Sequence, residues 1–191
     1  EEEDGDKMGM RRAKEFSEQL RKTCRVIKDK NYLMVCSNQI RDNLDTQSHI
    51  KYTTPGGKAM GFYSSLRLRF NNPEKINAEA TIAGKTVKRV IGVKTVVEVF
   101  KSSIWSPFRT APITIDFSYG IDNIRDSIQF IKDYTKNTTY TFDGQTIGKS
   151  MNEAIQCIES GNLENDLKNE VIGLWEEIES KFKVQRKEKV R

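Results

Sequence analysis

The chain has 191 residues, of which 36% are hydrophobic and 31% charged, a balance typical of a folded globular protein. No apolar run approaches the roughly 18 residues that cross a bilayer, and the first residues are acidic, which argues against a membrane span or a signal peptide. The net charge is +5. A single histidine argues against a histidine-based hydrolase or zinc centre, and three scattered cysteines argue against a disulfide framework. The sequence has no GxxxxGK[ST] motif, so it does not carry the usual phosphate loop for a nucleotide.

The first third of the chain predicts a helix, a buried strand and a long loop. Apolar residues recur at three- and four-residue spacing over residues 9–30, which predicts an amphipathic helix. The continuous apolar run Tyr32–Cys36 is typical of a buried parallel strand, and such a strand needs neighbours on both sides. We therefore expect part of a sheet upstream of this chain. Asn38–Lys51 is polar and predicts a loop, and Thr53–Gly57 predicts a turn.

The middle of the chain predicts strands. Alternation over Phe62–Phe70 favours one strand, and β-branched residues predict two more, Val87–Ile91 and Thr95–Lys101, with Gly92 as the turn between them. Ile113–Phe117 predicts a further strand.

After residue 120 the pattern becomes helical. Isoleucines from Ile121 to Ile131 predict a helix, and Tyr140–Gly144 predicts a hairpin with an Asp-Gly turn. A second helix runs from Ile147 until Gly161 ends it, and a third runs from Leu163 to Phe182 with Trp175 on its apolar face. We therefore predict two domains, a strand-rich α/β region over 1–120 and a small domain over 121–191 that ends in a frayed basic tail.

Charge differs between these regions. Residues 51–110 hold eleven basic and three acidic side chains, whereas residues 111–180 hold five basic and thirteen acidic ones. A basic middle suits a protein that binds a polyanion with one region, although solvated faces that differ by chance explain charge alone equally well.

Gln39 lies where a parallel strand would end. The carboxyl ends of such strands are where α/β sheets place ligand chemistry, and an amide there can orient a phosphate or a water. A plain exit from strand to loop is the alternative reading of this segment by itself.

Several segments together resemble the bacterial RecA recombinases. Asn38–Arg41, a dozen loop residues and then Thr53–Arg67 are similar to that family's NQIR strand end, DNA-binding loop and TTxGGxALKFYxSxRL segment. Other segments follow in the family's order, namely Gly5–Gly9, Phe16–Lys22, Val99–Phe108, Tyr119–Gly120 and Tyr140–Gly148. The resemblance covers almost the whole chain.

This resemblance implies the fold class α/β. It implies a partial RecA-like core of the phosphate-loop type, without the phosphate-loop half, followed by a small α+β C-terminal domain. A missing upstream segment or a separate chain would then supply the phosphate loop, since the family carries it before the point where this chain starts.

The resemblance also implies contacts with ATP and Mg²⁺. Gln39 matches the family's sensor of the γ-phosphate, and Lys101 matches a lysine that reaches the neighbouring subunit's ATP, so both are expected to be catalytic. Tyr119 matches a tyrosine that lies against the nucleotide base. Ser103 replaces a second interface lysine.

A further set of residues is implied to bind DNA. Gly5–Gly9 matches the family's first DNA-binding loop, where Met8 matches an apolar wedge. Phe16–Lys22 matches the helix after that loop, where Arg21 matches a backbone contact. In the second loop, Arg41 matches a backbone contact, Leu44 a wedge between base triplets, and the pair Gly56 and Gly57 a place where backbone amides approach phosphates.

Two readings of function follow. The leading one is a recombination and DNA-repair protein that binds single-stranded DNA in an ATP-dependent filament and pairs it with duplex DNA, in the cytoplasm of a bacterial or phage-infected cell. It would be a DNA-dependent ATPase only as part of a complete protein. The alternative is a non-catalytic DNA-binding or filament-capping module without an ATP cycle, and a structural α/β domain without a nucleic-acid role remains a third option.

Overall fold

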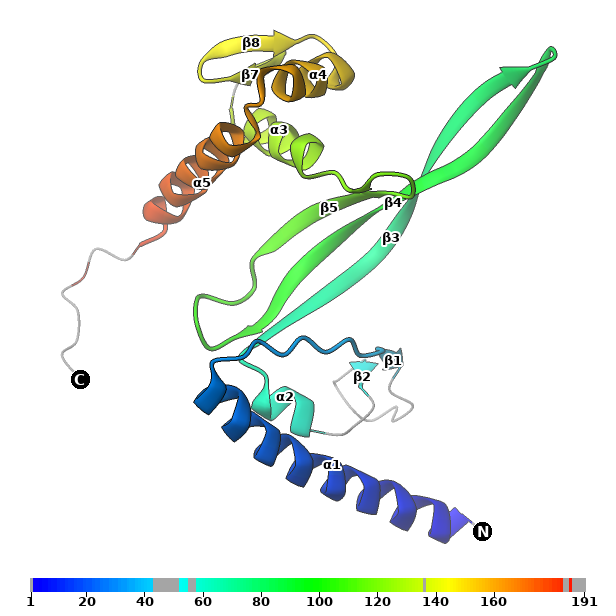
Figure 1. The fold of residues 1–191 in the computed structure, drawn as a ribbon, viewed down its shortest axis with the longest axis vertical. Coiled ribbons are helices and arrows are strands. Elements are labelled where there is room, and N and C mark those ends of the chain that lie inside the picture. Colours follow the sequence, from blue (N-terminus) through cyan, green and yellow to red (C-terminus); the bar gives the residue numbers. More distant parts are fainter. Residues whose placement is uncertain (1, 43–51, 55–57, 136, 184–185, 187–191) are drawn as a thin grey trace. The chain divides into compact units, whose positions relative to one another are not determined.

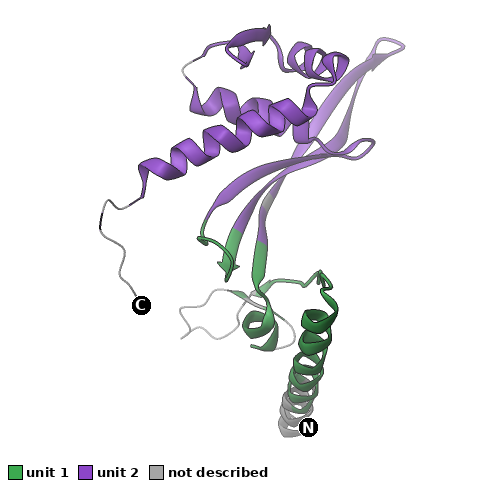
Figure 2. Ribbon diagram, turned by 60° about the vertical axis from the view of Figure 1, so that its left-hand side comes forward, with its two compact units in different colours: residues 1–68, 99–108 green, residues 69–98, 109–191 purple. Residues whose placement is uncertain are grey.

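A computed structural model describes residues 2–42, 52–54, 58–135, 137–183 and 186. The chain divides into two compact units, coloured separately in Figure 2. Unit 1 comprises residues 1–68 and 99–108, and unit 2 comprises residues 69–98 and 109–191. Each unit is described by itself below.

Unit 1 opens with helix α1 (Glu2–Lys30). The predicted helix is confirmed, and Leu20 is its buried apolar residue. The helix begins before residue 9, so the expectation of a loop at Gly5–Gly9 is wrong. This stretch holds no proline, the residue that most disfavours a helix interior.

The expected buried strand at Tyr32–Cys36 is also wrong. These residues form no strand and are all exposed, with Leu33 89% and Val35 84% accessible. An apolar run becomes a buried strand only when neighbouring strands cover it, and no described strand pairs with this one.

Short elements follow in the region predicted as loop and strand. Strand β1 (Arg41–Asp42) pairs antiparallel with β2 (Tyr52–Thr53). Helix α2 (Ala59–Tyr63) then occupies the start of the predicted strand Phe62–Phe70, which therefore begins only at Leu66. The Lys101 side chain binds the end of α2, as described below, and this tertiary contact favours a helical turn over continued alternation.

The main sheet has the order β3-β4-β5-β6 (Figure 1). Its strands are β3 (Leu66–Ile82), β4 (Lys85–Ser102), β5 (Thr110–Asp116) and β6 (Gly120–Ile121). Strands β3 and β4 form a long hairpin whose two-residue turn, Ala83–Gly84, has positive φ angles of 49° and 78°, as a tight hairpin turn requires. β5, which confirms the strand predicted near Ile113–Phe117, pairs antiparallel with β4 over Gly92–Glu98.

Gly92 is not the turn that the sequence predicts, because β4 continues through it. Gly92 lies opposite Asp116 in the β4–β5 ladder, and a Cβ at this position would lie 2.4 Å from the backbone oxygen of Ile115. The glycine therefore permits close approach of two backbones within a strand.

Unit 2 also contains a helical module in which the three predicted helices and the hairpin are present, although Ile121 and Ile147, predicted to start two of the helices, lie in strands before them. It comprises α3 (Asn123–Tyr134), the hairpin of β7 (Tyr140–Phe142) and β8 (Gln145–Gly148), α4 (Met151–Gly161) and α5 (Glu164–Lys181). The buried core of this module is Ile124, Ile128, Ile131, Ala154, Ile158 and Leu167. The Asp143–Gly144 turn is confirmed, with φ angles of 48° and 70°.

The helix ends of this module use local polar groups. The Asp122 carboxylate accepts a hydrogen bond from the Arg125 backbone N–H at the start of α3, and the Ser150 hydroxyl accepts one from Glu153 at the start of α4. Gly161 is the last residue of α4, and Asn162 takes the left-handed conformation that stops the helix.

Candidate functional site

The predicted second loop begins and ends at one short ladder. Gln39 is exposed and lies two residues before β1. Its backbone N–H donates a hydrogen bond to Asn38 Oδ1 over 2.9 Å. In the β1–β2 ladder Arg41 lies opposite Thr53, which brings the two ends of the predicted loop side by side. The Arg41 side chain is exposed and therefore accessible to a large ligand.

Several predicted DNA-binding residues lie outside the described residues. These are Leu44, Gly56 and Gly57, together with the single histidine, His49. The pairing of β1 with β2 fixes where the loop starts and ends.

Lys101 contacts the helix that follows this loop. Its Nζ donates to the carbonyl oxygens of Gly61 at 2.7 Å, Ser64 at 2.8 Å and Phe62 at 3.3 Å. These carbonyls belong to the last turn of α2, where a cation both satisfies free acceptors and interacts favourably with the helix dipole. Lys101 therefore holds α2 to the end of β4 within unit 1.

Helix α1 presents a basic surface. Arg21, one of the predicted DNA contacts, is exposed, as are Lys14, Lys22 and Arg25. Met8 lies on the same helix, and its side chain is outside what the structure describes.

Tyr119 lies in unit 2, in a tight turn between β5 and β6. The Asp116 Oδ1 atom accepts hydrogen bonds from the Ser118 hydroxyl, the Ser118 backbone N–H and the Tyr119 backbone N–H. These donors, the Ser118 hydroxyl foremost, lower the pKa of Asp116 below its ordinary value. The turn presents the Tyr119 side chain 63% exposed.

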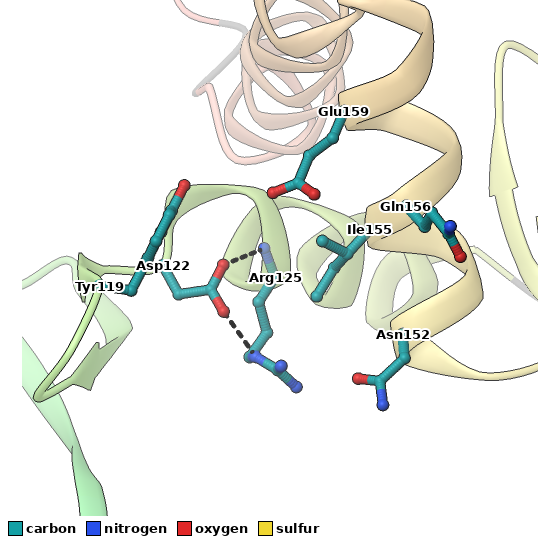
Figure 3. Close-up of a pocket in the computed structure, with 7 residues that line it drawn as sticks. All are labelled: Tyr119, Asp122, Arg125, Asn152, Ile155, Gln156 and Glu159. Atoms are coloured by element: carbon teal, nitrogen blue, oxygen red, sulfur yellow. Dashed lines mark hydrogen bonds and ion pairs between the residues drawn. The ribbon is translucent and has the colours of Figure 1, made fainter.

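Tyr119 also borders a shallow pocket of about 450 Å³ (Figure 3). Its other lining residues are Asp122, Arg125, Asn152, Ile155, Gln156 and Glu159. Arg125 Nε donates to Asp122 Oδ2 over 2.8 Å, so these two charges form an ion pair at the pocket wall. The sequence analysis missed the polar residues from α4, although Asn152 and Gln156 are four apart and so share one face of a predicted helix.

The predicted site residues divide between the two units. Gln39, Arg41 and Lys101 belong to unit 1, whereas Tyr119 belongs to unit 2. Among the described residues, no three histidine, cysteine, aspartate or glutamate side chains gather as a metal site would need, so no ligand to Mg²⁺ can be assigned here. The helices that the structure describes include none with the length and apolar character to span a membrane.

Comparison with known proteins assigns the sequence to a family. A family model described as "RecA N-terminal domain" matches residues 1–122. The protein RecA of Mycoplasma mycoides is 28% identical over 164 residues, which are 84% of this chain and 44% of that protein. The protein RecA of Acholeplasma laidlawii is 30% identical over 164 residues, 83% of this chain and 47% of the relative. The protein RecA of Thermus aquaticus is 34% identical over 119 residues, 61% of this chain and 32% of the relative. The chain thus spans less than half the length of these relatives.

Proposed function

The chain belongs to the RecA family, and from this premise we propose that it acts in homologous recombination and DNA repair as part of a strand-exchange protein. In this role it binds single-stranded DNA within a helical filament of copies and pairs that strand with homologous duplex DNA. The observation that carries the proposal is the β1–β2 ladder, because it closes the predicted DNA-binding loop between Arg41 and Thr53.

DNA binding in this proposal depends on the phosphate backbone. Arg41 and Arg21 are exposed guanidinium groups, and they neutralise phosphates without reading bases. Met8 and Leu44 are proposed to wedge between bases, and the pair Gly56 and Gly57 to let backbone amides approach phosphates. The eleven basic side chains of residues 51–110 supply a favourable field for the same ligand.

ATP and Mg²⁺ are proposed to act through residues attached to the two ends of this loop. Gln39 lies two residues before β1, and Lys101 binds the carbonyls of α2, which follows the loop. A γ-phosphate contact at either residue would therefore bear directly on the loop between them. Lys101 would do so across the filament interface, at a neighbouring copy's nucleotide.

One predicted residue in each unit has a side chain suited to contact a nucleotide. Gln39 supplies an exposed amide and Tyr119 an exposed ring, which would meet a phosphate and a base respectively. The sequence contains no GxxxxGK[ST] motif, so a further segment or separate chain is proposed to hold the phosphates and Mg²⁺. ATP supplies the energy of the filament cycle when bound, and hydrolysis by this chain alone is not part of the proposal. The expected compartment is the bacterial or phage-infected cytoplasm.

A salt series of DNA binding tests this function. The full chain is titrated with a fluorescent oligo-dT and a duplex of equal length at several salt concentrations. We expect preference for the single strand and a strong loss of affinity with salt. Arg41→Ala should weaken binding to all base compositions alike and reduce the salt slope by about one. Salt-independent binding, or a loss confined to one base composition, would contradict the phosphate contact.

The basic excess of residues 51–110 also suits a second candidate, a DNA-binding or filament-capping module without an ATP cycle. Repeating the titration with an ATP analogue, and with a protein that carries the phosphate-loop half supplied, separates the two. An analogue-dependent gain in single-strand affinity supports the recombinase, and its complete absence supports the module.

A further inference from the structure

The outer part of the long hairpin has no third strand beside it. β4 pairs with β5 only from Gly92 to Glu98, and β3 lies at the edge of the sheet. Residues 76–91, here called the arm, therefore form a two-stranded ribbon that runs past the end of β5 (Figure 1). Such ribbons are marginally stable in water by themselves, so a partner that covers one face would stabilise the arm.

The two faces of the arm differ in chemistry. The two-residue turn places Glu79 opposite Lys88, and their side chains form an ion pair of 3.2 Å. Because side chains alternate along a strand, Asn77 lies on this polar face, Lys75 lies on the same side just before the arm, and Val90 is an exposed apolar residue of this face. The opposite face carries Ile76, Ala78, Ala80, Ile82, Val87 and Ile91. On that apolar face Ile82 is 64% exposed and Ile91 38% exposed.

Two basic residues frame the apolar face. Lys85 and Arg89 lie on the same face as Val87 and Ile91, because side chains two apart along a strand point the same way. Both are exposed and make no ion pair with any acid in the described parts of the chain. An apolar centre with a cationic rim fits a protein surface that offers an apolar side chain beside carboxylates. A second arm does not fit, because it would bring the same positive charges together.

The helical module of another copy has the complementary character. Residues 122–181 hold six basic and twelve acidic side chains. Helix α5 buries Leu167 against the module core, and on its outward side Ile172 is 44% exposed with the exposed Glu176 one turn further on. An apolar residue beside a carboxylate is what the arm requires.

We propose that the apolar face of the arm docks onto the outward face of α5 in a second copy of this chain. Ile82 packs on Ile172, and Lys85 and Arg89 pair with Glu176 and the acids around it. The contact joins two different surfaces, so it can repeat from copy to copy, in a ring if the rotation closes and in an open filament if it does not. The inference rests on the proposed function in one respect, namely that copies assemble in a filament.

Charge reversal tests this contact without disturbing a core. K85E/R89E reverses the rim of the apolar face, and K75E/K94E makes the same charge change on the polar face as a matched control. Sedimentation velocity over a concentration series measures self-association of the full chain. We expect about tenfold or more weaker association for K85E/R89E and little change for the control, because like charges would then meet at the contact. Equal effects of the two variants, or no effect of either, would overturn the proposal.

Rescue identifies the partner surface. E176K alone should weaken association, and a mixture of E176K with K85E/R89E should restore it, because every arm then meets an α5 of opposite charge. Failure of this mixture to associate would exclude α5 as the partner. If K85E/R89E associates normally but loses affinity for duplex DNA, the arm is a DNA contact and the proposal fails.

Binding of oligo-dT, measured in parallel, reports on the proposed function separately. K85E/R89E and K75E/K94E should lower affinity for the single strand to the same extent, because each reverses two of the eleven basic charges of residues 51–110. A wild-type chain that associates but does not bind oligo-dT would leave the docking contact supported and reject the recombination role.

Discussion

At the scale of single residues, Lys101 has a structural contact with α2 besides the nucleotide contact proposed for it. Its ammonium group has three donors, and it contacts three carbonyl oxygens at the end of α2. A phosphate at a filament interface would have to replace at least one of these acceptors. Occupancy of that phosphate site and the grip on α2 would therefore be coupled.

Gln39→Ala tests whether nucleotide and DNA binding are linked at the other end of the loop. With the phosphate-loop half supplied, the variant should still bind ATP, because Gln39 would contribute one hydrogen bond to the charged γ-phosphate, about 1.5–3 kcal/mol, while the phosphate loop makes the main contacts. It should lose the ATP-dependent gain in oligo-dT affinity, since the loop would no longer respond to the γ-phosphate. Fluorescence titration with and without an ATP analogue measures both affinities. If the variant keeps the full gain, Gln39 is not the sensor.

Gly92→Ala tests the close approach of β4 and β5. The added Cβ would meet the Ile115 backbone oxygen at 2.4 Å, so the strands must move apart, and we expect a loss of about 1–3 kcal/mol in the free energy of unfolding. Gly173→Ala is the matched control, because a Cβ there has open space within helix α5. It should stabilise the chain by up to about 1 kcal/mol. Urea unfolding of both variants provides the comparison, and equal stability would contradict the strand geometry.

At the scale of elements, the sequence predicts structure best where residues within the segment itself determine its conformation. The isoleucines of α3 recur at helical spacing, and Asp143–Gly144 carries the chemistry of its turn, so both were predictable. Tyr32–Cys36 was not, because burial of an apolar run depends on strands elsewhere. Gly92 was misread because glycine serves tight turns and close strand contacts alike. For the candidate site, sequence placed Gln39 before the loop, but the contact between Lys101 and α2 joins residues about 40 positions apart and has no local signal.

Leu167→Ala should destabilise the helical module more than Trp175→Ala. Leu167 is 1% exposed in the core, whereas Trp175 is half-buried and the neighbouring Phe182 is 75% exposed, so the apolar stripe of α5 is only partly covered. We expect a loss of about 2–5 kcal/mol for Leu167→Ala. Thermal unfolding followed by circular dichroism measures both variants. A larger loss of stability for Trp175→Ala than for Leu167→Ala would show that Trp175 is a core residue, as the sequence pattern predicts.

Glu179→Gln tests the ion pair between α5 and the start of β5. Arg109 donates to both Glu179 carboxylate oxygens, over 2.7 and 2.6 Å, and these hydrogen bonds lower the pKa of Glu179 below its ordinary value of 4.5. A carboxylate with a lowered pKa in the folded state stabilises the fold above pH 4.5, and this contribution is lost as the pH falls through the folded-state pKa.

The stability of the parent should therefore fall more steeply in acid than that of Glu179→Gln, which has no carboxylate to protonate. Urea midpoints measured from neutral pH down to below 4.5 show the difference. Parallel curves for the two proteins would mean that the ion pair does not contribute.

At the scale of the whole chain, the basic and acidic side chains lie in different regions, as the proposed DNA binding by one region requires. The basic excess lies in residues 51–110, which contain the end of the predicted DNA loop and the arm, and the acidic excess lies in residues 111–180. A polyanion would be attracted to the former and repelled by the latter. The acidic module is thus better suited to a protein surface than to DNA, in agreement with the docking contact inferred for α5.

The open edge of β3 has a consequence for how the protein behaves at high concentration. An edge strand of this length, Leu66–Ile82, is a template on which other chains can add strands and aggregate. Pro73 lies within β3 and lacks the backbone N–H that such added strands would need. Lys75 and Glu79 place charges along the same edge. Pro73 and these charges therefore disfavour the addition of further strands to the open edge of β3. Replacing Pro73 with a β-branched residue should make the protein more prone to aggregate.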